Sequence, residues 1–172
     1  MLMKIGVLVG RFQPFHKGHL KAVDFALKHV DLLYISVGSA QKSHEPRNPF
    51  TAGERIKMIK MALDEAGVDC RKIMIVPVPD AVQHSVWVSY VDALVLDYDI
   101  VFSNEPLTTQ LFKERGIKVV PVSLADRENY KGTEIRERMD AGKPWKHLVP
   151  KAVAKIIEEI DGADRMRNLP KS

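Results

Sequence analysis

The chain has 172 residues, of which 45% are hydrophobic, so it is the size of about one domain with an ordinary buried core, and we expect one domain over residues 1–172. Its formal charge of +4 favours anionic partners such as nucleotides and is too low for a nucleic-acid-binding tail. The single cysteine, Cys70, excludes an internal disulfide framework and predicts a cytoplasmic location.

Five short runs rich in Val and Ile are predicted to be β-strands: 4–10, 32–39, 72–78, 100–103 and 118–122. They are almost continuously apolar, which is typical of strands covered on both faces. The first strand opens the chain without the basic start and cleavage site of a secretory leader. No apolar run reaches the roughly 18 residues of a membrane span, so no membrane partner is expected.

Segments with helical periodicity alternate with these strands. Residues 20–30 form the first such segment, and Thr51 to Glu54 has the capping-box pattern that starts a second helix. Further helices are predicted over 85–96, 107–115, 133–141 and 151–160, and the polar end, 161–172, is expected to fray. The alternation predicts an α/β fold, a Rossmann-like doubly wound parallel sheet flanked by helices. Such sheets bind ligands beyond the carboxyl ends of their strands.

The segment with most candidate functional residues is 10–20, where the first strand leads into the first helix. His16 and His19 stand three residues apart, so they share a face at the amino end of the helix if its first turn has begun, and Gly18 permits close backbone approach by a ligand. A helix start with two imidazoles and Arg11 beside it favours an anion site. Alternatively, a histidine at this position can be a surface or capping residue, or the two histidines can be part of a metal site. No HExxH motif supports a metal. The GxGxxG and Walker motifs are also absent, which disfavours a dehydrogenase or a P-loop kinase.

A family resemblance rests on these residues. The string Gly-Arg-Phe-Gln-Pro-Phe-His-Lys-Gly-His at 10–19 resembles the HxGH signature of the nucleotidyltransferase superfamily. The longer pattern is similar to archaeal-type nicotinamide-mononucleotide adenylyltransferases, through 35–41, 48–55, 103–106 and 132–136. One departure is that the superfamily's late Ser-Ser-Thr-x-x-Arg segment keeps only Thr133 and Arg136 here.

The resemblance implies transfer of the adenylyl group of ATP to nicotinamide mononucleotide, which gives NAD and pyrophosphate. It also implies Mg²⁺ that is bound mainly through substrate phosphates, with no protein ligand assigned. The archaeal relatives imply a homo-oligomer, namely a hexamer.

Site residues follow from the same resemblance. It gives His16, His19, Arg136 and Arg11 catalytic roles on the ATP phosphates, with His19 on the α-phosphate and Arg136 on the β- and γ-phosphates. The remaining ATP-binding residues are expected to be Gly10, Asn104 and Thr133. The acceptor is expected to contact Gly38, Ser39, Arg47, Asp80, His84 and Trp87, with Trp87 stacked on the cationic nicotinamide ring.

Each assignment has an ordinary structural alternative. Lys42 is a further candidate for a phosphate contact, but Lys42, Arg47 and Arg136 can all instead be solvated surface charges. Thr133 can cap its helix, and Trp87 fits a core-facing stripe. Asn104 and the residues that follow the strands can serve in turns, and Glu105 receives no role.

Two other functions compete. The same phosphate machinery would serve another acceptor, such as flavin mononucleotide or phosphopantetheine, although Trp87 and residues 48–55 disfavour it. A noncatalytic nucleotide-binding sensor is also compatible with the fold alone. The presence of His16, His19 and Arg136 disfavours that reading.

Overall fold

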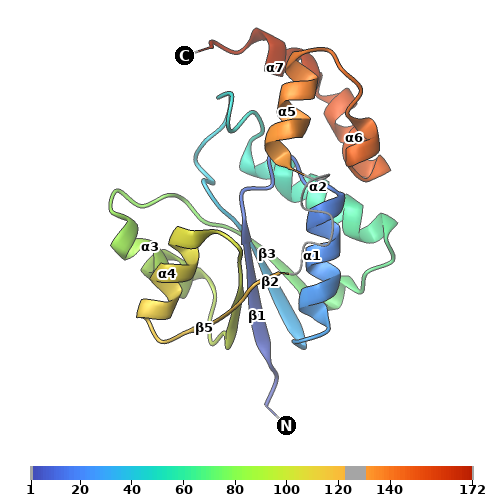
Figure 1. Ribbon diagram of the computed structural model, residues 1–172. Coiled ribbons are helices and arrows are strands. Elements are labelled where there is room, and N and C mark those ends of the chain that lie inside the picture. Colours follow the sequence, from blue (N-terminus) through green and yellow to red (C-terminus); the bar gives the residue numbers. More distant parts are fainter. Residues whose placement is uncertain (1, 123–130, 172) are drawn as a thin grey trace. The chain divides into compact units, whose positions relative to one another are not determined.

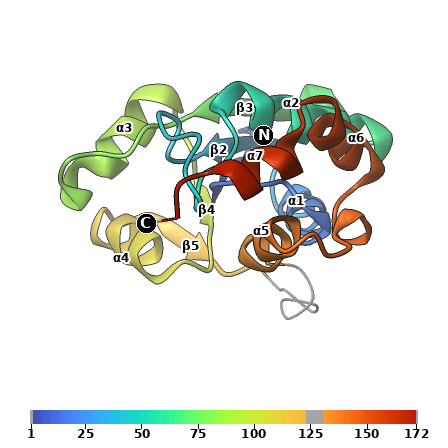
Figure 2. The same cartoon turned by 90° about the horizontal axis from the view of Figure 1, so that it is seen from above.

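The computed structural model (Figures 1 and 2) describes residues 2–122 and 131–171, and these form two compact units. The first, here called the sheet unit, comprises residues 2–11, 22–40 and 69–122. The second, here called the helical unit, comprises 12–21, 41–68 and 131–171. A single domain over 1–172 stays a prediction from length.

The sheet unit is built on five parallel strands: β1 (Ile5–Gly10), β2 (Leu32–Val37), β3 (Ile73–Pro77), β4 (Ile100–Phe102) and β5 (Lys118–Val120). Their order across the sheet is β3-β2-β1-β4-β5. The chain therefore moves outward from β1 to β3 and then returns to the other side of β1. The order reverses between β1 and β4, where doubly wound sheets bind ligands. All five predicted strands are confirmed, as is the Rossmann-like fold class.

Helices cover both faces of this sheet. On one face lie α3 (Trp87–Leu94) and α4 (Pro106–Glu114), which Figure 2 shows on the same side. Val88 and Val91 of α3 and Phe112 of α4 join Val7 and Val101 of the sheet in one buried cluster. The other face receives α1 (Lys17–Leu27), a helix that begins in the helical unit and continues into the sheet unit, and its Phe25 ring meets Phe102 edge to face. Two 3-10 turns, η1 (Cys70–Lys72) and η2 (His84–Val86), complete the unit.

The helical unit contains α2 (Ala52–Glu65), α5 (Gly132–Asp140), the 3-10 turn η3 (Lys146–Leu148), α6 (Lys151–Glu159) and α7 (Gly162–Asn168). The predicted capping box of α2 is confirmed, because the Thr51 hydroxyl accepts from the Glu54 amide at 3.1 Å and Glu54 accepts from the Thr51 amide at 2.9 Å. Across residues 2–122 and 131–171, every helix is too short or too polar for a membrane crossing.

Helix α7 corrects the expectation of a frayed end at 161–172. Met166 is buried, and Arg165 pairs with both Glu54 oxygens, at 2.7 and 2.8 Å. Gly162 lies so close to Phe50 that an added Cβ would be 2.8 Å from a ring carbon. These contacts join positions more than a hundred residues apart, so local polarity did not predict the helix.

Candidate active site

The two histidines of the turn into α1 cap each other in the structure. The His16 amide donates to His19 Nδ1 at 3.2 Å, and the His19 amide donates to His16 Nδ1 at 3.3 Å. The rings are stacked, with centroids 3.5 Å apart and planes 19° from parallel. Because each Nδ1 accepts a hydrogen bond, the proton of each neutral imidazole lies on Nε2. Both rings therefore present an Nε2–H donor.

Burial keeps both imidazoles uncharged at neutral pH. Burial, together with the charge of Arg136, lowers the pKa of His16 to about 4. Burial against an apolar wall also holds the pKa of His19 well below its ordinary value, and His16 adds to this effect. That wall includes Phe12 and Phe15, whose ring centroids lie 4.8 and 5.5 Å from that of His19. The pair consequently acts as two neutral hydrogen-bond donors.

Arg136 of α5 belongs to the same group of residues. It is 9% exposed, and its Nη1 donates to the backbone carbonyl of Gln13 at 2.8 Å while its Nη2 donates to the Thr133 hydroxyl at 3.2 Å. Thr133 is not the helix cap, because the residue in that position is Lys131. A side chain at Gly132 would crowd the contact, since its Cβ would lie 3.1 Å from Nη1. Arg136 is therefore a held, buried cation and not a solvated one.

The helical unit thus brings together four of the predicted site residues: His16, His19, Thr133 and Arg136. Arg47 and Lys42 lie in the same unit and are exposed. Gln13 had no role in the sequence interpretation, although it lies within the segment 10–20 singled out there. Its contacts make it part of the site's framework.

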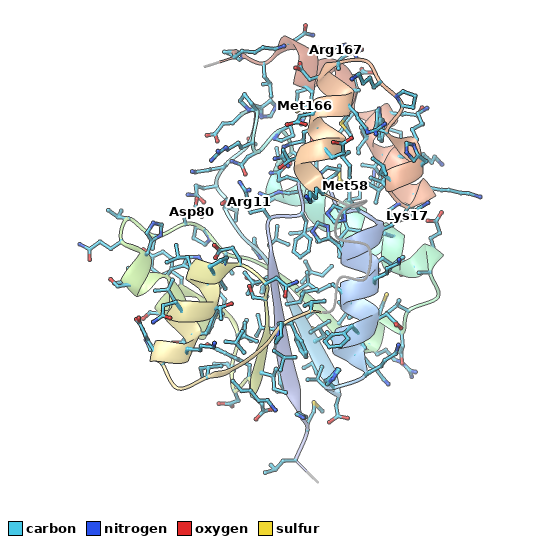
Figure 3. All side chains as sticks on the ribbon, in the orientation of Figure 1. Arg11, Lys17, Met58, Asp80, Met166 and Arg167 are labelled. Atoms are coloured by element: carbon cyan, nitrogen blue, oxygen red, sulfur yellow. The ribbon has the colours of Figure 1, made fainter. Side chains whose placement is uncertain are left out.

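A second set of predicted residues lies at the carboxyl ends of β1, β2 and β3 in the sheet unit. The Gly38 amide donates to the Gly10 carbonyl at 2.8 Å, and the Ser39 hydroxyl donates to Asp80 at 2.9 Å. Ser39 has a φ of 48°, in the left-handed region that non-glycine residues rarely adopt. Figure 3 labels Arg11 and Asp80, both at this end of the sheet. The strand-end position expected of a ligand site is thus occupied by Gly10, Arg11, Gly38, Ser39 and Asp80.

Asn104 and Glu105 follow β4. Both polar ends of the Asn104 amide bind the backbone of Val122, each at 2.9 Å, so this side chain fixes the segment after β5. Glu105 caps α4 by accepting from the Thr108 and Leu107 amides at 2.6 and 3.2 Å. Although burial opposes its ionisation, these bonds and the charge of Arg11 hold the pKa of Glu105 below its ordinary value. Glu105 therefore has a structural role that the sequence interpretation left open.

Trp87 and His84 lie in the connection after β3. His84 is exposed, whereas Trp87 is half-buried and meets Phe112 edge to face at a centroid distance of 5.9 Å. Part of the Trp87 ring therefore packs toward the core, as the structural alternative for this residue predicted.

Metal ligands were not assigned from the sequence. Within the two described stretches, 2–122 and 131–171, no group of three or more His, Cys, Asp or Glu side chains is arranged to hold a metal ion.

The stacked, mutually capped imidazoles and the buried Arg136, in a chain with a doubly wound parallel sheet, are compatible with a nucleotide-binding transferase. The family model described as "Cytidylyltransferase-like" matches residues 7–138. A nicotinamide-nucleotide adenylyltransferase of Pyrococcus horikoshii is 49% identical over 95% of this chain and 88% of its own length. One from Methanolobus tindarius is 47% identical over 99% of this chain and 96% of its own length. The chain belongs to the cytidylyltransferase-like family and, within it, to the nicotinamide-nucleotide adenylyltransferases. The family resemblance noted in the sequence is confirmed.

Solved structures agree on the fold. The bifunctional NMN adenylyltransferase/ADP ribose pyrophosphatase of Francisella tularensis is 24% identical, with a TM-score of 0.81 over 98% of this chain. The same protein complexed with AMP and a Mn ion gives a TM-score of 0.77 over 96% of this chain. This chain spans about half of that bifunctional protein, 52% of its length.

Proposed function

We propose that this chain transfers the adenylyl group of ATP to nicotinamide mononucleotide, which gives NAD and pyrophosphate. The observation that carries the proposal is the group of His16, His19 and Arg136, two neutral donors and one cation, in a member of this family. An oxygen of the acceptor's 5′-phosphate forms a bond to the α-phosphorus of ATP. The bond from that phosphorus to the bridging oxygen breaks, and its electron pair leaves with pyrophosphate.

This reaction needs no general base. A phosphate monoester with a second pKa of about 6 is largely dianionic at neutral pH, so it attacks without losing a proton. The two histidines fit this requirement, because their Nδ1 atoms are occupied and their Nε2 atoms carry protons. We assign His19 Nε2–H, and His16 beside it, to oxygens of the α-phosphate. Their dipoles are oriented before charge develops in the transition state.

Arg136 supplies the positive charge. We assign it to the β- and γ-phosphates, because a forked guanidinium matches phosphate oxygens. Thr133 is proposed to bind ATP beside it, Arg11 to contact further oxygens of the ATP phosphates, and Arg47 to contact the phosphate of the acceptor. Gly10 and Asn104 are proposed ATP contacts in the sheet unit. A divalent cation, for which we propose Mg²⁺, would bind mainly through the substrate phosphates.

For the acceptor we propose the strand-end residues of the sheet unit. The hydrogen bond from Ser39 to Asp80 fixes a carboxylate beside the backbone of Gly38, a position suited to polar groups of a ribose or an amide. Trp87 is proposed to offer the part of its ring not packed on Phe112 to the nicotinamide, and His84 a polar contact. The homo-oligomeric, hexameric assembly and the cytoplasmic location remain proposals as well.

The test measures pyrophosphate release from ATP and Mg²⁺ with four acceptors offered separately: nicotinamide mononucleotide, nicotinic acid mononucleotide, flavin mononucleotide and phosphopantetheine. Release with the nicotinamide nucleotide, together with NAD, supports the proposal. Release only with flavin mononucleotide or phosphopantetheine would keep the phosphate chemistry and refute the acceptor assignment. Tight ATP binding without release for any acceptor would favour the nucleotide sensor.

A further inference from the structure

The side chain of Gln13 is bound to the backbone of a residue 37 positions away. Its Nε2 donates to the Phe50 carbonyl at 2.8 Å, and its Oε1 accepts from the Phe50 amide at 3.0 Å. Gln13 is 3% exposed and Phe50 is fully buried. Because the carboxamide both donates to and accepts from the same residue, the two hydrogen bonds fix its position and its rotation.

The backbone of Gln13 is the point at which Arg136 is held. Arg136 Nη1 donates to the Gln13 carbonyl at 2.8 Å. A Cβ at Gly132 would lie 3.3 Å from that same carbonyl oxygen and 3.1 Å from Nη1, so only a residue without a side chain leaves this contact uncrowded. The direction of the guanidinium therefore depends on where the Gln13 carbonyl lies.

The backbone of Phe50 is itself held in place by contacts with α2 and α7. It directly precedes Thr51, the cap of α2, and the ring of Phe50 packs against Gly162 of α7. Arg165 donates to the carbonyl of Pro49 at 3.0 Å, which fixes the same stretch from the other side. The carbonyl that orients Arg136 is thus connected through Gln13 to the framework of α2 and α7.

We propose that Gln13 is a positioning residue, which sets the orientation of Arg136 toward the β- and γ-phosphates of ATP by fixing the turn at 12–16 on the backbone of Phe50. The inference rests on the phosphate role proposed for Arg136. Gln13 itself touches no substrate in this scheme, since its side chain is buried and bound at both ends to Phe50.

The first test replaces Gln13 by Met, which has similar length and no polar end. We expect kcat/KM for ATP to fall on the order of tenfold to a hundredfold, as for other misplaced substrate-positioning groups, with KM for ATP raised and KM for nicotinamide mononucleotide little changed. If Gln13 had only a structural role, the Gln13→Met protein would contain a smaller fraction of active molecules, which lowers kcat and leaves KM for ATP unchanged. Val153→Ala, a buried truncation on α6, is the control for destabilisation within the helical unit.

Gly132→Ala perturbs the same contact without altering the Gln13 side chain, and it serves where Gln13→Met does not fold. We expect it to raise KM for ATP in the same way. If either folded variant keeps the wild-type kcat/KM for ATP, the proposal is overturned.

A double-mutant cycle then asks whether Gln13 acts through Arg136. Gln13→Met combined with Arg136→Lys should be no slower than Arg136→Lys alone to within about twofold, because the group being positioned is already gone. Losses that multiply would overturn the proposal.

Binding of tripolyphosphate, measured by calorimetry, separates this inference from the proposed function. Wild-type affinity in Gln13→Met contradicts the positioning role, whereas a wild-type protein that binds but makes no NAD contradicts only the function.

Discussion

Acid should destabilise this protein through His16, and the size of the effect follows from its burial. The ordinary pKa of 6.5 applies to the unfolded chain, and the folded pKa is about 4. The stability that comes from a neutral His16 is fully present above pH 6.5 and is lost as the pH falls toward 4, since only the unfolded chain takes up the proton in that range. At about 1.4 kcal/mol per pH unit, the loss is about 2 kcal/mol by pH 5 and about 3 kcal/mol by pH 4. The pKa of His19 is also lowered, so it adds a loss of the same sign.

Urea unfolding at pH 7, 6 and 5 measures this loss, above the range in which most carboxylates titrate. The perturbation is His16→Asn, whose side-chain oxygen can accept the His19 amide in place of Nδ1 and does not titrate. The variant should lose about 2 kcal/mol less than the wild type between pH 7 and pH 5. His44→Asn, at an exposed position, is the control and should follow the wild type. Equal pH dependence in His16→Asn and the wild type would show that His16 is not the source of the acid destabilisation.

Three further predictions concern the helical unit. His19→Ala should leave the circular dichroism spectrum unchanged and lower kcat by about a hundredfold or more, and wild-type turnover in the folded variant would remove His19 from catalysis. Arg165→Ala should lower the free energy of unfolding by about 1–3 kcal/mol at pH 7. Burial opposes the ionisation of Glu54, but the hydrogen bonds from Arg165 and Thr51 outweigh it and lower the pKa of Glu54. The difference should therefore shrink in acid as Glu54 is protonated, leaving the part due to the Pro49 carbonyl, and an undiminished difference there would contradict the pairing. Gly162→Ala should cost about 1–3 kcal/mol in thermal unfolding, because its Cβ would lie 2.8 Å from the Phe50 ring, and an unchanged Tm would show that the contact relaxes.

The sheet was predictable because its signal is local. Each strand is a short apolar run between polar segments, and the observed bounds lie within two residues of the predicted ones. The start of α2 was equally local, since Thr51 and Glu54 form the capping box that their spacing predicts. Helix α7 was not predicted because its stability depends on Arg165, Gly162 and their partners on α2 and before it, which no window of sequence contains.

The sequence named several of the side chains that lie together in the candidate site, but it did not predict the geometry of their contacts. The spacing of His16 and His19 indicated a shared face, but the reciprocal amide bonds and ring stacking are seen only in the structure. The capping role of Glu105 could have been predicted from the sequence, because an acidic residue directly before Pro106 is a typical helix start. The contact of Arg136 with Gln13 spans 123 positions and involves a backbone oxygen, so no pairing of side-chain types predicts it.

The site combines two neutral donors, His16 and His19, with one cationic donor, Arg136, and electrostatic repulsion explains this combination. If His16 and His19 were protonated, two stacked cations would lie near the guanidinium of Arg136, and their repulsion inside a buried site would oppose folding. Neutral imidazoles avoid this repulsion and keep their Nε2–H donors, whose direction the Nδ1 bonds fix. In the proposed reaction, the attraction that overcomes repulsion between the two anionic substrates would then come from arginine and from a divalent cation that arrives with the triphosphate. This division of roles makes the orientation of Arg136, and with it the anchoring of Gln13 on Phe50, the structural feature on which the electrostatics of the proposed reaction depend.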